Sequence, residues 1–214
     1  MKLTATILES ESQIAQFILN ELKESVTKLI KKAIPSITKE IKLIVADSLR
    51  NQPEYTSLMA GKLKAELGLS DSSVVDSVIN GMVESLNIEQ QDIKVSNKGL
   101  SGGFKLTMIS SNDISGLIFT DISQVFDDKG YSLPWLEWLL LKGNEVLVKN
   151  YAVKYTTSNR SRSGMAIMEP SDSTNWRVPA EFAGTQKNNW TTRAIDNIEA
   201  QIYNVLITNI NKYI

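Results

Sequence analysis

The side chains best suited to recognition in this sequence are its tryptophans and arginines, and both types are concentrated in the second half of the chain. All four tryptophans follow residue 130, and four of the five arginines lie between residues 160 and 193. Tryptophan and arginine dominate the binding energy of protein–protein interfaces. We therefore take as candidate contacts with another subunit or with DNA the following residues: Arg160, Arg162, Trp176, Arg177, Phe182, Trp190 and Arg193.

Two of these arginines lie in a polar segment, Thr156–Gly164, whose sequence is TTSNRSRSG. Its composition predicts a surface loop or a long hairpin arm, which is where binding residues are often found. For Arg160 and Arg162, contact with a partner subunit or a DNA phosphate is as well supported as plain exposure to solvent. Trp135 and Trp138, in contrast, belong to a densely apolar stretch, and we interpret them as core residues.

Catalytic chemistry is poorly supported, because the 214-residue chain contains neither histidine nor cysteine. These absences exclude a thiol nucleophile, a disulfide and a cysteine-based metal site, and they remove the commonest general base near neutral pH. The glycines at 99–103 lack the Lys-Ser/Thr that follows them in a phosphate-binding loop. We expect no catalytic residue, metal or cofactor; a hydrolase that relies on carboxylates alone is the least favoured alternative.

The charge balance and hydropathy of the chain limit its partners further. Lys and Arg number 23 and Asp and Glu 24, so the net charge is −1 and gives no overall attraction to nucleic acid or anionic lipid. The first residues, MKLTATILESES, do not form a signal peptide, and no window approaches 18 uninterrupted apolar residues. The sequence predicts a soluble protein without a membrane partner.

The elements that must position these residues begin with helices. Ile14, Ile18 and Leu22 start an apolar stripe of helical spacing, which Pro35 is expected to stop or kink before it resumes as far as Arg50. A further helix is predicted over 53–67, with Gly68 as its C-terminal cap, and another up to Leu86, capped by Ser70 or Asp71.

Strand patterns follow the helices. Asp92–Ser96 and Phe104–Ser110 predict a hairpin with its turn at Gly99, Gly102 and Gly103, and the Val- and Tyr-rich segment Glu145–Tyr155 predicts the strongest strand. Two further short strands are expected, at Gly116–Asp121 and at Met165–Met168. A buried turn of helix is expected at Tyr131–Leu141, and a closing helix at Asn188–Tyr213.

This order favours the α+β class over alternating βαβ units. The expected architecture is a helical N-terminal region over residues 1–90, followed over 91–214 by an α+β domain with a small, mainly antiparallel sheet and a C-terminal helix.

The helices within residues 54–86, joined by the sequence GLSD, also resemble a helix-turn-helix, so a soluble DNA-binding regulatory protein is an alternative. The second helix of such a motif must offer Lys or Arg to DNA, but the segment Asp71–Leu86 contains three acidic residues and no basic one. We therefore favour a packed helical pair over a DNA reader.

A family resemblance covers roughly Leu133 to Ile195. The succession LPWLEWLLLKGN, a Val-rich strand, SRSGMAIM and then WRVPAEFAGTQKNNWTTRAI before a terminal helix resembles virion proteins of tailed bacteriophages, and most closely their neck and tail-completion proteins. The upstream segment GKLKAELGLSD, over Gly61–Asp71, is similar to a segment that precedes the sheet in such proteins. The long helical N-terminal third departs from the family pattern.

The resemblance implies a structural role without catalytic residues. It implies a homo-oligomeric ring, a hexamer or dodecamer, at the head–tail junction or upper tail of the virion, assembled in the host cytoplasm. Neighbouring neck and tail proteins would be its partners, and genomic DNA would pass through its lumen without sequence-specific contacts. A tail terminator or another ring at the end of the tail tube is the nearest alternative.

A ring needs two different complementary patches on each subunit, because its contacts are head-to-tail. The arm at 156–164 with the WRVPAEF turn is the candidate for one patch, and the apolar helical stripe of residues 14–49 for the other. Replacing Arg160 and Arg162 with alanine is accordingly expected to weaken assembly and to leave the fold intact.

Overall fold

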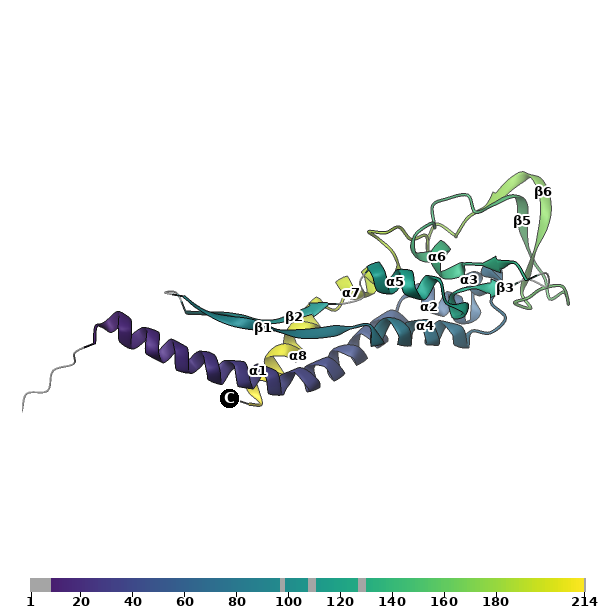
Figure 1. The fold of residues 1–214 in the computed structure, drawn as a ribbon. Coiled ribbons are helices and arrows are strands. Elements are labelled where there is room, and N and C mark those ends of the chain that lie inside the picture. The colour runs from purple at the N-terminus through teal and green to yellow at the C-terminus, as the bar shows by residue number, and fades with distance from the viewer. Residues whose placement is uncertain (1–8, 97–98, 108–110, 127–129, 214) are drawn as a thin grey trace, which may run out of the picture. The chain divides into compact units, whose positions relative to one another are not determined.

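The computed structural model of the chain describes residues 9–96, 99–107, 111–126 and 130–213 (Figure 1). It confirms the α+β class: helices predominate, and the strands of the described residues form three two-stranded antiparallel sheets. The chain divides into two compact units. Unit 1 comprises Met1–Glu40, Asn87–Thr107 and Asn204–Ile214, and unit 2 comprises Ile41–Leu86 and Met108–Tyr203, so each unit draws on both of the regions expected from the sequence.

Helix α1, Glu11–Arg50, is a single helix that contributes to both units and contains Pro35. Of the two alternatives expected at Pro35, an end of the helix is wrong, and the helix continues through Pro35 to Arg50. A proline inside a helix costs about 3 kcal/mol because it removes a backbone hydrogen bond and crowds the preceding turn. Ala33 and Ile37, on either side of it, are completely buried. Burial of this apolar stripe offsets the local cost and keeps the helix continuous.

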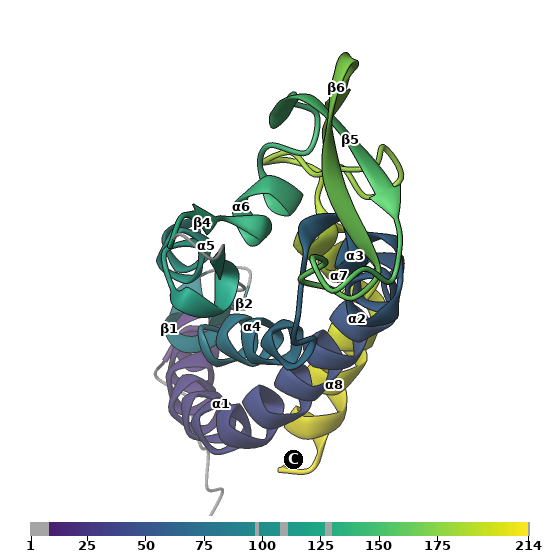
Figure 2. The same ribbon diagram turned by 90° about the vertical axis from the view of Figure 1, so that its right-hand side faces the viewer.

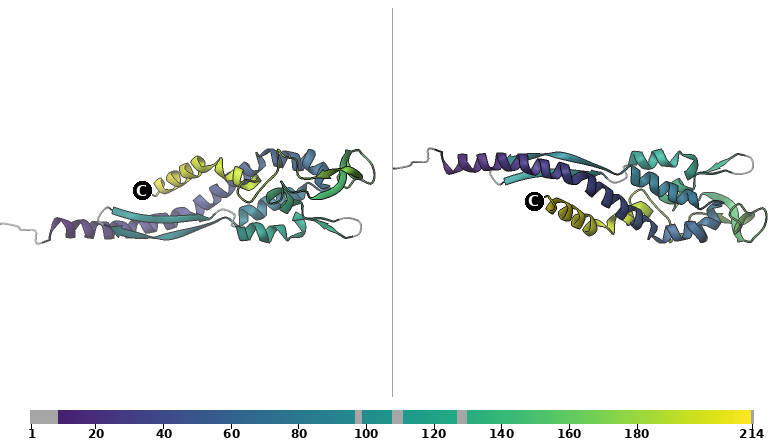
Figure 3. Two further views of the ribbon diagram at one scale, coloured as in Figure 1. Left: turned by 90° about the horizontal axis from the view of Figure 1, so that it is seen from above. Right: turned by 90° about the horizontal axis from the view of Figure 1, so that it is seen from below.

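The rest of unit 1 is built around a hairpin of β1, Asn87–Ser96, and β2, Gly99–Thr107. The hairpin lies along α1, where Gln90 Nε2 donates to the Thr27 carbonyl at 3.3 Å (Figure 3). The end of α8, Glu199–Asn211, completes the unit, and Lys212 lies 3.6 Å from the Glu40 carboxylate.

The hairpin is confirmed, but the expected turn is not, because Gly99, Gly102 and Gly103 all lie within β2. The strand register shifts between Gln91 and Lys94, and at this irregularity a Cβ on Gly102 would approach the Asp92 carbonyl to 2.4 Å. Gly102 also has a φ of 129°. The glycine is therefore used for close approach of the two backbones at a bulge. Residues 97–98 and 108–110 of the expected hairpin lie outside the described residues.

Unit 2 contains three short helices after α1: α2, Pro53–Ala60; α3, Lys62–Leu67; and α4, Ser73–Glu84. The single helix expected over 53–67 is broken at Gly61, where the Ser57 hydroxyl accepts the Leu63 backbone N–H at 2.9 Å and so caps the new helix start. Gly68 ends α3 in the left-handed conformation, with a φ of 72°, which confirms the predicted cap. The Asp71 carboxylate accepts the Ser73 N–H at 2.8 Å before α4.

The middle of unit 2 contains the helix α5, Ser111–Ile118, and a 3-10 turn η1 at Asp121–Ser123. The short strands β3, Val125–Phe126, and β4, Ser132–Leu133, follow, and then the helix α6, Trp135–Leu140.

The strand expected at Gly116–Asp121 is wrong, because residues 116–118 belong to the helix α5. Leu117 of α5 packs so closely against α4 that a Cβ on Gly81 would approach its Cδ2 to 2.7 Å. Tertiary packing thus overrides the β-like composition. The buried turn of helix predicted at Tyr131–Leu141 is confirmed by α6.

The last part of unit 2 holds a hairpin of β5, Val148–Tyr155, and β6, Ala166–Trp176 (Figure 2). β6 is much longer than the short strand expected from the sequence. The closing helix is interrupted, because α7, Trp190–Asp196, ends before α8 begins at Glu199. The side chain of Asn189 starts α7 by accepting the backbone N–H groups of Thr191 and Thr192.

The core of unit 2 consists of large, fully buried side chains contributed by α1, α2, α4, α6 and α7. They include Leu49, Leu58, Ile79, Trp135, Leu139 and Trp190. This core supports the helix ends and the β5–β6 hairpin from which the candidate site is built.

Candidate functional site

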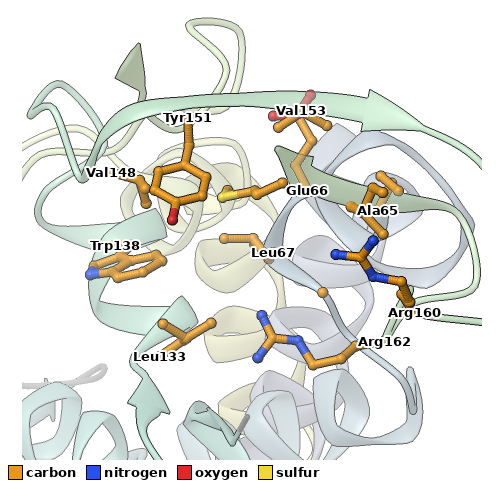
Figure 4. A pocket seen from close by; sticks show the side chains of 14 residues that line it. Ala65, Glu66, Leu67, Leu133, Trp138, Val148, Tyr151, Val153, Arg160 and Arg162 are labelled. Carbon is orange, nitrogen blue, oxygen red and sulfur yellow. The ribbon is translucent and has the colours of Figure 1, made fainter. Parts of the chain in front are cut away.

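A cavity of about 560 Å³ opens in unit 2 beside the C-terminal end of α3, α6 and the β5–β6 hairpin (Figure 4). Its volume lies within the usual range for ligand pockets. Trp138 and Tyr151 line one side, and Arg160 and Arg162 approach from the other. Apolar side chains complete the lining, among them Leu67, Leu133, Val148, Val153, Ile167 and Met168.

The aromatic side of the cavity is held by a contact between two tryptophans. The ring centroids of Trp138 and Trp176 are 5.8 Å apart, with 55° between the ring planes. Trp176 is buried and its Nε1 donates to Glu66 Oε2 at 2.7 Å. Aromatic pairs in tilted geometry add stability beyond the area that they bury. Trp176 therefore positions Trp138 and does not itself line the cavity.

The second oxygen of the Glu66 carboxylate accepts the hydroxyl of Tyr155 at 2.5 Å. Partial desolvation raises the pKa of Tyr155 to about 12 even though the residue is 57% exposed, with further contributions from the hydrogen bond to Glu66 and from the charges of Glu66 and Glu181. Glu66 thus accepts one strong hydrogen bond at each oxygen, from residues at the ends of β5 and β6. It fastens the hairpin to α3.

The loop that carries the two arginines is ordered by its serines. Ser161 Oγ donates to the Ala166 carbonyl at 2.6 Å and accepts the Ala166 N–H at 3.1 Å. Ser163 Oγ donates to the Ala65 carbonyl of α3 at 3.3 Å. The expectation of an irregular segment at 156–164 is confirmed, and these hydrogen bonds fix its backbone between the strands. The serines alternate with the arginines, so the same anchoring presents Arg160 and Arg162 on the cavity.

Neither guanidinium group forms an ion pair within the described part of the chain. Arg162 lies over Gly68, where an added Cβ would be 3.2 Å from its Nε. It also borders a neighbouring hollow with Asp71, whose pKa is lowered by hydrogen bonds from Ser73. Both arginines are exposed on their solvent side. The cavity therefore combines an apolar floor with two arginines that form no ion pair among the described residues, although Glu66 also lines it.

The other residues expected to form a site do not gather here. Trp190 is fully buried, and its Nε1 donates to the Leu49 carbonyl at 3.0 Å. Arg193 forms an ion pair with the buried carboxylate of Glu54. Arg177 is exposed and Phe182 half-buried, and neither lines the cavity. Trp190 and Arg193 thus stabilise the core, and only Arg160 and Arg162 of the predicted set line the cavity.

Sequence reasoning did not single out Glu66 or Tyr151 as site residues, and its interpretation of Trp138 as a core residue is wrong, because Trp138 is half-buried and lines the cavity. Glu66 carries no distinguishing local signal, since it is one charged residue on a short helix. Tyr151 and Val153 alternate along β5, so they share a face of the hairpin, and this period is visible in the sequence. Which face lines the cavity depends on the tertiary contacts of β6 and α3.

Unit 1 carries a different surface, which we call the α1 face and define by the exposed apolar residues Ile14, Phe17, Ile18 and Leu22. Their side chains are 37%, 66%, 54% and 47% exposed, respectively. The same stripe continues along the helix as Ile30, Ala33 and Ile37, which are buried. Four glutamates and one lysine lie between residues 9 and 24, so this part of the chain has a net charge of −3.

The helix pair considered for DNA binding presents an acidic second helix. In α4, Asp76 accepts Arg50 Nε at 3.0 Å, and Glu84 lies 2.7 Å from Lys42 Nζ. Basic residues are absent from α4, and its acidic ones pair with α1. This helix has no cation to offer to a phosphate.

Comparison with protein-family models, curated proteins and solved structures found no match to the chain. Among the residues that the structure describes, no three acidic, histidine or cysteine side chains form a group able to hold a metal ion. No helix in the same residues combines the length and the apolar character needed to cross a membrane.

Proposed function

We propose that this chain is a structural protein of a tailed-bacteriophage virion. In this proposal it forms a homo-oligomeric ring, a hexamer or dodecamer, at the neck or upper tail. The resemblance of Leu133–Ile195 to neck and tail-completion proteins supplies the class of protein. A tail terminator or other tail ring is the alternative position within the same class.

The observation that carries the proposal is the presence of two unlike surfaces that are suited to association. One is the cavity with its unpaired arginines in unit 2, and the other is the exposed α1 face in unit 1. Monomeric soluble proteins rarely expose contiguous large apolar side chains without a partner. Rings require two different patches on every subunit, since each contact joins one patch to the other.

The charge of the chain is compatible with a ring that lets DNA pass. A net charge of −1 avoids strong, salt-dependent binding to phosphates, which would slow the passage of a genome. In the proposed assembly, DNA contacts are weak and independent of sequence. Neighbouring neck and tail proteins stack on the ring, which is built in the host cytoplasm and remains in the virion.

The proposal is tested on virions and not only on the purified chain. Mass spectrometry of gradient-purified particles is expected to detect the chain at a constant copy number, and antibody-linked gold is expected to label the head–tail junction or upper tail. Labelling of the capsid surface or the tail tip, or absence of the chain from the particles, would refute the proposal. A stain-filled ring in electron micrographs of the purified chain would support it further.

A further inference from the structure

The cavity in unit 2 selects for a particular kind of occupant. Its apolar and aromatic lining favours an apolar anchor, and the guanidinium groups of Arg160 and Arg162 favour a carboxylate beside that anchor. Glu66 also lines the cavity, but among the described residues it forms no ion pair with either arginine, and its oxygens accept hydrogen bonds from Tyr155 and Trp176. A complementary surface therefore presents a large apolar side chain and an acidic one a few ångströms apart.

The α1 face has this combination. Phe17 is the most exposed of its apolar side chains, at 66%. Glu21 follows four residues later, so it lies on the same side of the helix one turn away. A shallow hollow is lined by these two residues together with Ile18 and Leu22. Glu21 forms no ion pair within the described part of the chain, whereas Glu24 lies 3.9 Å from Lys28.

We infer that the occupant of the cavity is the α1 face of a second copy of this chain. Phe17 of one copy enters between Trp138 and Tyr151 of the other, and Glu21 pairs with Arg160 and Arg162. The inference rests on the proposed function, because it specifies the contact through which the subunits associate. The two surfaces have opposite net charges, −3 on residues 9–24 and two arginines against one glutamate, Glu66, on the cavity, and this favours the acidic α1 face over a neutral occupant.

A symmetric contact between two α1 helices is less well matched. Its charges would match, because the acidic N-terminal part of one α1 would face the basic segment of the other that contains Lys28, Lys31 and Lys32, but its apolar surfaces would not. Ile30, Ala33 and Ile37 of that segment are already buried by the chain's own elements, and Leu29 and Ile34 are only partly exposed. They offer Phe17 less apolar surface than the cavity does.

A contact between the α1 face and the cavity is head-to-tail, so its consequence differs from that of a symmetric dimer. Each copy uses one surface to bind the previous copy and the other to bind the next. Such a contact closes into a ring or continues as a filament, according to the rotation between successive subunits.

The inference is tested with two full-length variants, each defective in one surface. The helix variant, Phe17→Asp with Glu21→Lys, keeps the cavity, and the cavity variant, Arg160→Glu with Arg162→Glu, keeps the α1 face. Each variant alone is expected to be monomeric by mass photometry and analytical ultracentrifugation. An equimolar mixture is expected to form a dimer and nothing larger, because one intact contact remains in the mixture.

The single change Phe17→Ala measures the anchor itself. Truncation of a central interface anchor weakens association by about 30-fold or more, so the concentration at which oligomers form is expected to rise by that factor. A charge-swapped chain that combines Glu21→Arg with Arg160→Glu and Arg162→Glu is expected to recover part of the assembly lost by Arg160→Glu and Arg162→Glu alone.

The matched control is Lys149→Glu with Lys187→Glu. It makes the same change in net charge at two exposed residues that do not line the cavity, and it is expected to assemble normally. Circular dichroism of every variant is expected to match the unmodified chain.

Several results would overturn the inference. A mixture that stays monomeric, or a cavity variant that assembles while the helix variant does not, would replace it with a contact between α1 helices or with another site. Loss of DNA binding by the cavity variant with unchanged assembly would make the arginines phosphate ligands. Each of these results can occur while the chain is still found in the neck of virions, so failure of the inference is distinguishable from failure of the proposed function.

Discussion

The two units of this protein differ in how completely they bury the large apolar side chains of their helices, although unit 2 also exposes apolar residues such as Phe119, at 80%. Unit 2 buries large residues such as Trp135, Leu139 and Trp190 completely. In unit 1 the corresponding large residues of α1, Phe17 and Ile18, are more than half exposed, and a two-stranded hairpin contributes most of the remaining structure. A single hairpin is marginally stable by itself.

The difference indicates that the two units have different roles, one in stability and the other in association. Unit 2 obtains its stability from its own core, and its surface can therefore hold unpaired arginines at fixed positions. Among the described residues, unit 1 leaves the apolar side chains of the α1 face exposed, and contiguous exposed apolar patches mark interaction sites. The following four predictions test this comparison, beginning with the largest expected effect on stability.

Trp190→Ala is expected to lower the free energy of unfolding by about 3–5 kcal/mol. The substitution opens a cavity in the core of unit 2 and leaves the Leu49 carbonyl without the 3.0 Å hydrogen bond from Trp190 Nε1. Phe17→Ala, an aromatic truncation on unit 1, is expected to change stability by less than about 0.5 kcal/mol. Urea denaturation of both variants below the concentration of assembly provides the comparison. Equal losses would show that the two units do not differ in this respect.

Arg193→Ala is expected to cost about 2–3 kcal/mol, since it leaves the carboxylate of Glu54 buried without its charge partner. The Glu54 side chain is 1% exposed and that of Arg193 31%, so the cost lies below that of a fully buried pair. Lys42→Ala breaks a pair whose glutamate is 76% exposed and is expected to cost less than about 1 kcal/mol. Thermal unfolding of the two variants ranks them, and a reversed order would contradict the role given to Arg193.

Gly102→Ala is expected to destabilise the hairpin of unit 1 by about 2 kcal/mol, because it combines a φ of 129° with a Cβ placed 2.4 Å from the Asp92 carbonyl. Gly103→Ala is the matched control: its φ is 136°, but no atom lies within 4 Å of the new Cβ, so about 1 kcal/mol is expected. Hydrogen exchange of the β1 and β2 amides measures the local effect. Protection in unit 2 is expected to stay unchanged, and a loss there would show that the units unfold together.

Tyr155→Phe is expected to change the alkaline stability of unit 2 by the smallest amount. The pKa of Tyr155 is raised from 10.0 to about 12 in the folded protein, so the folded state holds the proton more tightly than the unfolded state. This contribution to stability is complete below pH 10 and is lost as the pH rises towards 12.

Denaturation of unmodified and Tyr155→Phe protein between these pH values is expected to show a steeper decline for the unmodified chain. The Glu66→Gln variant keeps Tyr155 but lacks the carboxylate charge, so its stability is expected to fall less steeply with pH than that of the unmodified chain. Identical slopes in all three proteins would contradict the contact between Tyr155 and Glu66.

The parts of the fold that the sequence predicts well are those controlled by neighbouring residues. Gly68 ends α3 as expected, because the left-handed conformation of a helix cap suits glycine whatever surrounds it. The β5 strand and the polar loop after it follow from composition in the same way. The failures at Pro35 and at Gly116–Asp121 both concern segments whose local preference is overridden by burial against distant parts of the chain.

The residues of the candidate site show the same distinction between what the local sequence reveals and what tertiary contacts decide. Arg160 and Arg162 are conspicuous in the sequence because they stand among serines in a loop, and they do line the cavity. Arg193 and Trp190 have the same residue types, but they contact Glu54 and Leu49, which are far away in the sequence. No local pattern distinguishes an arginine that pairs with a buried glutamate from one that stays unpaired.

The sequence by itself determines that this protein lacks thiol and imidazole chemistry, that it begins with amphipathic helices, and that its arginines and tryptophans lie in its second half. These properties depend on residue types and on spacing along the chain. Only the tertiary structure decides that the apolar stripe of α1 is covered at Ile37 and exposed at Phe17, and that two arginines share a cavity with Trp138 and Tyr151. Burial and charge pairing depend on residues brought together by folding, and spacing along one segment does not contain that information.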